Sequence, residues 1–444
     1  MNSTGLKKAL AGAGVALALG CLPARADAQP PERAYAPGEV VVELDDGGST
    51  VVELEPGTPV DEGIEELRAE PGVRSATPNW TARAAVSPLD QGTSGTPGGW
   101  AADQWSLLGK PGGIRAPAAW DRLDAVGSPG GFGVTIAVVD TGIAYADAPG
   151  FAAAPDFMPT RFVEGLDLVD DDSQPLDLNG HGTHVASTIG EQITLGQPAP
   201  APDYLAGIAY GASLMPIRVL DANGVGSTDD VAAGILWAAR NGADVINLSL
   251  NFDPAVDSCR EAPTVCDAIR RAKALGALVV GSAGNQLERQ GARRALFPAG
   301  APGAFAVAAS TEDGCLAEYS HYGKRTDLVA PGGGPARASA ARPECADDAI
   351  PILQLSYACF PGDCSRDRTT FAIRPDVGTS MSAAHTSAVA ALVIASGVAG
   401  ADPPASRVAE RLECTARPAK PRRFYGPGLL DARRAVDPKR SCDA

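Results

Sequence analysis

Beyond residue 100, short apolar runs rich in β-branched residues alternate with segments of helical periodicity. The runs that we expect to form buried strands are residues 134–139, 213–219, 245–250, 277–281 and 304–309. Helical spacing is found at residues 182–191, 229–241 and 266–275. This alternation predicts an α/β fold with a mostly parallel central sheet covered by helices on both faces. In such sheets the chemistry lies at the carboxyl ends of the strands.

The chain before residue 100 has a different pattern. Residues 37–44 and 73–81 are predicted strands, and residues 60–70 have the spacing of an amphipathic helix. We expect a small α+β unit, which is too small to be very stable alone. Residues 84–99 are rich in Ser, Pro, Gly and Thr, and predict a linker that is open to proteolysis.

The first residues predict a signal peptide. Lys7 and Lys8 precede an apolar run at residues 9–22, and Ala24-Arg25-Ala26 offers a small-x-small cleavage site. The apolar run is too short to span a bilayer. We therefore expect a signal peptide at residues 1–26 and a secreted, extracellular or periplasmic, protein.

Charge and hydropathy exclude two classes of partner. A formal net charge of -16 and a pI near 4.7 argue against nucleic acid and anionic membrane surfaces. The other long apolar stretch, residues 387–399, is short for a membrane span and predicts a buried helix. Lipid anchoring at Cys21 is the less favoured alternative to secretion, because Ala18 stands where a lipoprotein signal usually has a branched aliphatic residue.

Nine cysteines become eight once the signal peptide is removed. An even number in an exported chain predicts disulfides, and neither the cysteine spacing nor the few histidines fit a zinc site. Because short loops close most easily, we expect pairs that are near in sequence. These pairs are Cys259–Cys266, Cys315–Cys345, Cys359–Cys364 and Cys414–Cys442.

Four polar residues stand beside small residues at the ends of predicted elements. Asp140 ends one buried run, His181 lies between two glycines at a helix start, and Asn285 follows another buried run. Ser380 lies in Gly-Thr-Ser-Met-Ser, ahead of the long apolar segment. Each of them alone could be an ordinary cap or turn residue. Together they supply an acid, an imidazole, an amide and a hydroxyl.

Acyl transfer requires these four groups. A serine hydroxyl needs a base within hydrogen-bond reach, and a carboxylate holds the tautomer of a histidine base. The oxyanion needs fixed donors, here the Asn285 side chain and the Ser380 N–H. The order Asp, His, Ser differs from that of the α/β-hydrolases and of chymotrypsin, and the G-x-S-x-G elbow is absent. An esterase of the α/β-hydrolase type is therefore disfavoured.

The segments around these residues resemble the motifs of the subtilisin-like serine proteases. The matching segments are V-V-D-T-G at 138–142, H-G-T-H-V-A at 181–186, A-G-N at 283–285 and G-T-S-M-S at 378–382. The resemblance covers residues 100–435 and implies a subtilisin-like three-layer fold and a serine endopeptidase. By resemblance, Asp140 orients His181, and His181 acts first as a base and then as an acid. Ser380 attacks the substrate carbonyl, and Asn285 polarises it. It implies polypeptide substrates, no cofactor required for the chemistry, and a monomer.

Further residues resemble the family's substrate-binding segments, two of them strand edges that hold an extended peptide by β-augmentation. They are Gly224, Val225, Gly226, Ser249, Leu250, Asn251, Ala283 and Gly284. Asn251 replaces a usual glycine, so we expect its side chain to narrow the first specificity pocket, and the preferred substrate residue stays open. Ser187 and Ala384 replace a usual glycine and proline, and His385 is expected to pack inside a helix.

An acidic loop precedes the histidine motif. Asp167, Asp170 and Asp172 are similar in spacing to a calcium loop of thermitase-like family members, although Leu176 replaces one polar ligand. Crowded carboxylates repel one another unless a hard cation satisfies them. We expect a structural calcium ion here. The alternative is a solvated cluster of charges.

The N-terminal α+β unit is similar to a shortened subtilase propeptide, which assists folding and blocks the cleft until it is removed. The implied organisation is a propeptide and linker at residues 27–95, a peptidase domain at 96–444, and self-cleavage within 84–99. The alternatives are a dedicated maturation protease that cuts one partner, and a secreted binding protein that has lost activity. Residues 337–374 are an expected insertion that either shapes the cleft or braces the surface.

Overall fold

A computed structural model describes residues 35–45, 47–84, 103–157, 160–191, 205–285, 293–337, 345, 349–358 and 368–442. The predicted signal peptide, the predicted linker beyond Ala84 and the predicted Cys359–Cys364 disulfide lie outside these residues. The other three predicted disulfides are present.

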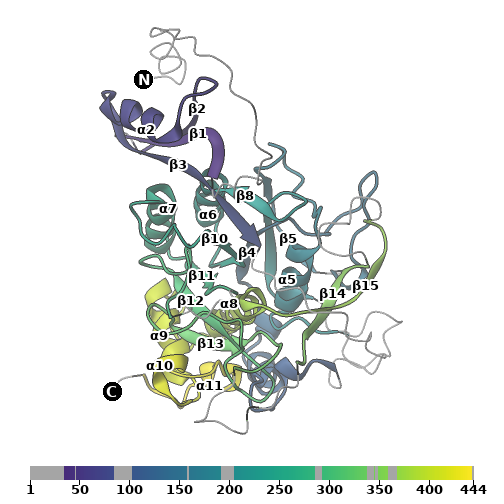
Figure 1. Cartoon of the computed structure of the whole chain (residues 1–444). Helices are drawn as coiled ribbons and strands as arrows, with labels where there is room; N and C mark the ends of the chain where they lie inside the picture. Colours follow the sequence, from purple (N-terminus) through teal and green to yellow (C-terminus); the bar gives the residue numbers. More distant parts are fainter. Residues whose placement is uncertain are drawn as a thin grey trace, which may run out of the picture.

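An eight-stranded sheet forms the centre of the molecule and confirms the predicted α/β fold (Figure 1). Its order is β13-β12-β11-β9-β4-β7-β5, with β6 also beside β7, and all of its paired strands are parallel. The strands are β4 (Thr135–Asp140), β5 (Arg161–Phe162), β6 (Leu166–Asp167), β7 (Ser213–Arg218), β9 (Val245–Leu248), β11 (Leu278–Ser282), β12 (Phe305–Ser310) and β13 (Leu328–Pro331).

Helices cover both faces of this sheet. They are α4 (Ala116–Ala125), α5 (His181–Gly190), α6 (Thr228–Arg240), α7 (Pro263–Ala274), α8 (Thr379–Ala395), α9 (Ala405–Thr415), α10 (Arg422–Tyr425) and α11 (Ala432–Ala435), with the 3-10 turns η2 (Trp105–Leu107), η3 (Pro129–Gly131) and η4 (Pro155–Phe157). Successive strand residues point to opposite faces. Ile136 and Val138 of β4 accordingly join the core that contains α4, α5 and α8. Ala137 and Val139 join the core that contains α6 and α7.

The central helix, α8, is buried from Thr379 to Val393. Its apolar and small residues surround the whole helix axis, which is typical of a helix that lies inside a large core. Ser380 is in its first turn, so the helix begins before the apolar segment that predicted it. No described helix is both long and apolar enough to cross a bilayer.

The N-terminal unit is a small sheet with one helix, as predicted. It contains β1 (Tyr35–Leu44), β2 (Ser49–Glu53), α2 (Val60–Ala69) and β3 (Val73–Ala84). The strand β2 was not predicted. Ile64 and Leu67 of α2 share a core with Val40 and Val42 of β1.

Strand β3 joins this unit to the rest of the molecule. Its first part pairs with β1, and its last residues pair with β8 (Val225–Ser227) and β10 (Leu250–Phe252). Figure 1 shows β3 running from the N-terminal unit into the main body beside β8. The strand was predicted to end at residue 81, whereas β3 continues to Ala84. The extension depends on pairing with β8 and β10, which the local sequence does not encode.

Two other predicted segments differ in detail. The run 245–250 forms two strands with different partners, β9 beside β4 and β11, and β10 beside β3. Within the expected insertion at residues 337–374, the described part forms an antiparallel hairpin, β14 (Ile352–Tyr357) and β15 (Phe371–Asp376). The hairpin packs against α5, as Figure 1 shows.

Candidate active site

Two strands and two helix starts bring the four predicted groups to one edge of the sheet. Asp140 is the last residue of β4, and His181 is the first residue of α5. Asn285 follows β11, and Ser380 is the second residue of α8. This is the carboxyl edge of the parallel sheet, where the sequence predicted a site.

His181 and Asp140 form a buried pair. The Nδ1 atom of His181 lies 2.6 Å from Oδ1 of Asp140, and both side chains are almost fully buried. The same Asp140 oxygen accepts a hydrogen bond from the Thr141 N–H. The Nε2 atom of His181 is buried and has no hydrogen-bond partner among the described residues. A histidine held at Nδ1 by a carboxylate and open at Nε2 has the geometry of a general base.

A glycine allows this close approach. A Cβ atom on Gly182 would lie 2.1 Å from the carbonyl oxygen of Gly142 and 3.2 Å from Asp140 Oδ1. Any side chain at residue 182 would therefore push the start of α5 away from the end of β4.

Neighbouring charges control the protonation of His181. Burial lowers the pKa of His181, but the charge and hydrogen bond of Asp140, with the charges of Asp376 and Asp177, raise it. The net shift of the pKa is upward. By contrast, burial lowers the pKa of His184, and lowers that of His385 to about 4. His385 lies within α8 and contacts the Met381 carbonyl, as expected for a packing residue.

Asp177 organises the loop that leads to His181. Its carboxylate accepts hydrogen bonds from the Thr141 hydroxyl, from the N–H groups of Asn179 and Gly180, and from both the N–H and the hydroxyl of Thr183. Burial raises the pKa of Asp177, and hydrogen bonds from the loop oppose this shift. The carboxylate thus ties the residue after Asp140 to residues on both sides of His181.

Ser380 is held at the N-terminus of α8. Its hydroxyl donates to the Ser249 carbonyl at 3.1 Å, and the Ser249 hydroxyl donates to the Ser380 carbonyl at 2.9 Å. The N–H groups of a first helical turn have no partner within the helix and favour negative charge. The Ser380 N–H is therefore a suitable oxyanion donor.

The Asn285 amide is oriented by the residue before Ser380. Its Oδ1 atom accepts hydrogen bonds from the Thr379 N–H at 2.8 Å and from the Thr379 hydroxyl at 2.7 Å. The same hydroxyl accepts from the Gly284 N–H. Because the oxygen of the amide is engaged in this way, its NH2 group is the part directed away from Thr379, as an oxyanion donor requires.

The two predicted substrate edges hold a segment of the chain itself. The end of β3 lies antiparallel to both edges, with Arg83 opposite Val225 of β8 and Asn251 of β10, and with Ala84 opposite Leu250. Gly226 fits against the underlying chain because a Cβ there would lie 2.0 Å from the Val219 carbonyl oxygen. The carboxyl end of β3 therefore runs along β10 toward Ser249.

Asn251 spans two strands next to this segment. Its side-chain amide donates to the Ser282 carbonyl at 2.7 Å, and its oxygen lies 3.4 Å from the Ser282 hydroxyl. Ser282 ends β11, whose following residues are Ala283, Gly284 and Asn285. The side chain thus bridges the edge that holds the peptide and the segment that carries the oxyanion amide.

The acidic loop already has a cation. Arg218 Nη1 lies 2.7 Å from Asp167 and 2.5 Å from Asp170. The other oxygen of Asp167 accepts the N–H groups of Val169 and Asp170, and Asp172 accepts that of Gln174. The described residues contain no group of three or more His, Cys, Asp or Glu side chains that could hold a metal ion. The donor set therefore fits the expected calcium poorly, and calcium stays a prediction.

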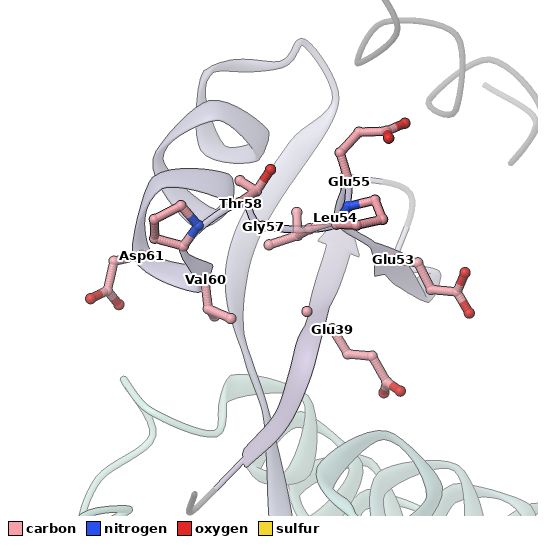
Figure 2. Close-up of a pocket in the computed structure, with 11 residues that line it drawn as sticks. Glu39, Glu53, Leu54, Glu55, Gly57, Thr58, Val60 and Asp61 are labelled. Carbon is pink, nitrogen blue, oxygen red and sulfur yellow. The ribbon is translucent and has the colours of Figure 1, made fainter. Parts of the chain in front are cut away.

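A separate pocket lies in the N-terminal unit. Its volume is about 770 Å³, and its lining includes the carboxylates of Glu39, Glu53, Glu55 and Asp61 (Figure 2). None of the candidate catalytic groups lines it. This pocket is therefore not the active site.

Several residues of the site were not identified from the sequence. They are Asp177 and Thr379, Ser249 in its contact with Ser380, and Asp376. Thr379 and Ser249 lay inside recognised motifs, so their positions were known but their partners were not. For Asp177, the only sequence indication of a role near the site was its position four residues before His181. The place of Asp376 depends on how the β14–β15 hairpin packs, which no local pattern encodes.

Comparisons with known proteins agree with this geometry. The model of the subtilase family of peptidases matches residues 131–428. Subtilisin Savinase from Lederbergia lenta is 32% identical over 324 residues, which is 73% of this chain and 96% of that protein. Thermitase from Thermoactinomyces vulgaris is 36% identical over 49% of this chain and 68% of its own length.

Other relatives are longer than the matched region. A thermophilic serine proteinase from Bacillus sp. (strain AK1) is 34% identical over 61% of this chain, and the match spans 57% of that protein's length. Among solved structures, a protease from Pseudoalteromonas arctica PAMC 21717 is similar with a TM-score of 0.59 and 29% identity. That match covers 76% of this chain and 96% of the solved chain.

Proposed function

Because this chain belongs to the subtilase family, we propose that it is a serine endopeptidase that uses Asp140, His181 and Ser380 on polypeptide substrates. The observation that carries this proposal is the buried His181–Asp140 pair, 2.6 Å apart, at the same edge of the sheet as a serine at a helix N-terminus. The imidazole is held by its Nδ1 atom, so Nε2 is available to take a proton from Ser380.

The reaction proceeds in two acyl transfers. Ser380 Oγ attacks the substrate carbonyl carbon while its proton passes to His181 Nε2, and the Asp140 carboxylate stabilises the imidazolium. The oxyanion accepts hydrogen bonds from the Asn285 NH2 group and the Ser380 N–H. His181 then gives its proton to the leaving amine, and a water molecule, activated by the same base, hydrolyses the acyl-enzyme.

The protein is made as a zymogen, with the N-terminal unit as its propeptide. The end of β3 pairs with both substrate edges, which supports a propeptide that blocks the cleft before cleavage. Cleavage then falls just beyond β3, within residues 84–99, and releases the peptidase domain from the propeptide and linker of residues 27–95. A signal peptide at residues 1–26 directs the precursor out of the cell, where the mature enzyme acts as a monomer.

Substitution of the nucleophile tests this proposal. A Ser380→Ala chain should accumulate uncut, whereas the wild-type chain should process itself, as N-terminal sequencing of the secreted product would show. Turnover should fall about a million-fold, the loss that follows removal of the same residue from subtilisin. Normal processing of Ser380→Ala in purified form would contradict the proposal.

Two further measurements separate the alternatives. A fluorophosphonate should label the wild-type chain and not Ser380→Ala; an unlabelled wild type would instead indicate a binding protein that has lost activity. Digestion of casein would indicate broad specificity, whereas cleavage of a single peptide in a defined panel would indicate a dedicated maturation protease.

A further inference from the structure

The β14–β15 hairpin contacts the loop that carries His181. The Ser356 hydroxyl donates to the Gly180 carbonyl at 2.6 Å, and the Tyr357 hydroxyl donates to the Asp177 carbonyl at 3.1 Å. Both side chains are buried. The two acceptors belong to the short segment that ends at His181, so the hairpin binds the backbone of this segment, whereas the Asp177 carboxylate binds its N–H groups.

The Gly180 carbonyl belongs to the peptide unit that joins Gly180 to His181. Gly180 has a φ of 103°, which glycine adopts without steric cost. Because glycine can also adopt other backbone conformations, this angle is held only if neighbouring groups restrain it. Its carbonyl already accepts the first hydrogen bond of α5, from the His184 N–H at 3.1 Å. The bond from Ser356 adds a second restraint, which fixes this peptide plane and therefore the direction in which His181 leaves the backbone.

The hairpin also contacts one side of α5. The Ser187 hydroxyl donates to the Leu355 carbonyl at 3.1 Å, and His184 Nε2 lies 3.2 Å from the Arg374 carbonyl. Ser187 stands where a glycine is usual in the resembling family, and in this chain its hydroxyl has a partner on β14. The contacts of the hairpin thus continue along the helix that begins with His181.

The same hairpin is continuous with the nucleophile. β15 ends at Asp376 and α8 begins at Thr379, so two residues separate the hairpin from the helix of Ser380. One antiparallel hairpin is therefore bonded covalently to the serine segment and by hydrogen bonds to the histidine segment.

We propose that the β14–β15 hairpin is a positioning element that sets the distance and direction between His181 and Ser380, with Ser356 and Tyr357 as its positioning residues. The inference rests on the proposed function, because it needs His181 to act as the base of Ser380. Proton transfer and attack depend steeply on geometry, and a displacement of about 1 Å can cost about a hundred-fold in rate.

The test compares Ser356→Ala, Tyr357→Phe and the double variant with wild type, each expressed as the full chain. Active sites are counted by fluorophosphonate titration, and kcat and KM are measured on one peptide substrate. We expect kcat to fall about tenfold in each single variant and about 30- to 100-fold in the double variant. KM should stay within about twofold, because the substitutions leave both substrate edges intact. Ser356→Thr retains the hydroxyl and should retain kcat.

Matched controls remove similar hydroxyls elsewhere. Ser396→Ala removes a hydroxyl that donates to the Val393 carbonyl at the far end of α8, and Tyr425→Phe removes one that accepts from the Leu316 N–H. Both should leave kcat unchanged even if they lower the melting temperature. A general loss of stability would lower activity in the controls as well.

A folded double variant whose kcat stays within about twofold of wild type would overturn the proposal, as would a change confined to KM. If the double variant does not fold, the single variants decide by the same criterion. A wild-type chain that neither cleaves peptides nor reacts with the fluorophosphonate would overturn the proposed function instead.

Discussion

The residues around His181 set the charge of the base. Burial lowers the pKa of His181, whereas Asp140, Asp376 and Asp177 raise it, and the net shift is upward from 6.5. The other histidine nearby, His184, has a lowered pKa, so it adds little positive charge near neutral pH. Since only neutral His181 can accept the proton of Ser380, activity should rise with pH through this raised pKa.

Replacement of Asp376 tests the electrostatic argument. Asp376→Asn removes a negative charge that favours the imidazolium, so the acid limb of kcat/KM against pH should move to lower pH, by a few tenths of a unit. Activity at alkaline pH should change little. Asp253→Asn, at an exposed residue on another loop, is the control, and the acid limb of its kcat/KM profile should stay at the wild-type pH. A limb that moves upward or not at all in Asp376→Asn would contradict the assignment.

Asn251 should restrict the substrate residue before the scissile bond. The antiparallel register ends at Leu250, opposite Ala84. A substrate that extended this register by one residue would place the residue before the scissile bond opposite Ser249, on the same face as Asn251. The Asn251 side chain is held by its hydrogen bond to the Ser282 carbonyl, so it should limit the space for a large substrate side chain on this face. We expect wild type to cleave after Ala in preference to Phe.

In Asn251→Gly the ratio of kcat/KM for Phe to that for Ala should rise at least about tenfold. The measurement uses two peptides that differ only at this residue. Asn241→Gly, at the exposed end of α6, is the matched control. A wild type that already prefers Phe would show that Asn251 does not narrow the pocket.

At the scale of elements, β6 and β7 hold the acidic loop through one buried ion pair. Asp167 and Arg218 lie opposite each other at the ends of these strands, and both are nearly fully buried. Loss of one partner of such a pair leaves an uncompensated buried charge. The guanidinium therefore places a positive charge in the loop for which the sequence predicted calcium.

Chelation and substitution together test this view. A chelator should leave the melting temperature of wild type unchanged, whereas Arg218→Met should lower the free energy of unfolding by about 3 kcal/mol and make it respond to added calcium. Arg270→Met, which removes an exposed pair with Asp267, should cost less than about 1 kcal/mol. A fall in the wild-type melting temperature on chelation would support the calcium prediction instead.

At the scale of the whole molecule, carboxylates of the N-terminal unit lie near carboxylates of α6. Glu39 of β1 faces Asp229 and Asp230 in the first turn of α6. A pocket of about 490 Å³, also lined by Glu53, lies between the two parts. Burial raises the pKa of Asp230, and the charges of Asp229 and Glu39 raise it further. The hydrogen bond from Ser227 lowers it, and the resulting pKa is about 6.

This arrangement predicts a propeptide that is held more tightly in acid. A carboxyl group whose pKa is raised in the complex stays protonated there while it ionises in the separated parts. The complex should therefore weaken as the pH rises from about 4 to about 6, and remain weaker above that. We expect the processed propeptide to dissociate about tenfold more readily at pH 7 than at pH 5, measured by inhibition of the mature enzyme. Asp230→Asn should reduce this difference, and an unchanged difference would contradict the prediction.

Much of the site could be predicted because its chemistry restricts residue identity. A nucleophile, base, acid and amide at strand ends, in one order, suit few reactions, so Asp140, His181, Asn285 and Ser380 were identified from local motifs. Asp177 stands at the end of the acidic loop, but its link to Thr141 was not predicted, and neither was the contact of Ser356 with Gly180. A hydrogen-bonding partner distant in the chain leaves no local pattern.

The sequence by itself determined the alternation of strands and helices, since burial on one or both faces dictates a period of about two or 3.6 residues. It also determined three disulfides that join cysteines near in sequence. Only the tertiary structure decided that Arg218 pairs with Asp167 and Asp170, that β3 lies between the two predicted substrate edges, and that the β14–β15 hairpin contacts the His181 segment. These are contacts between distant segments, and their geometry depends on how all the elements pack together, which periodicity along the chain does not contain.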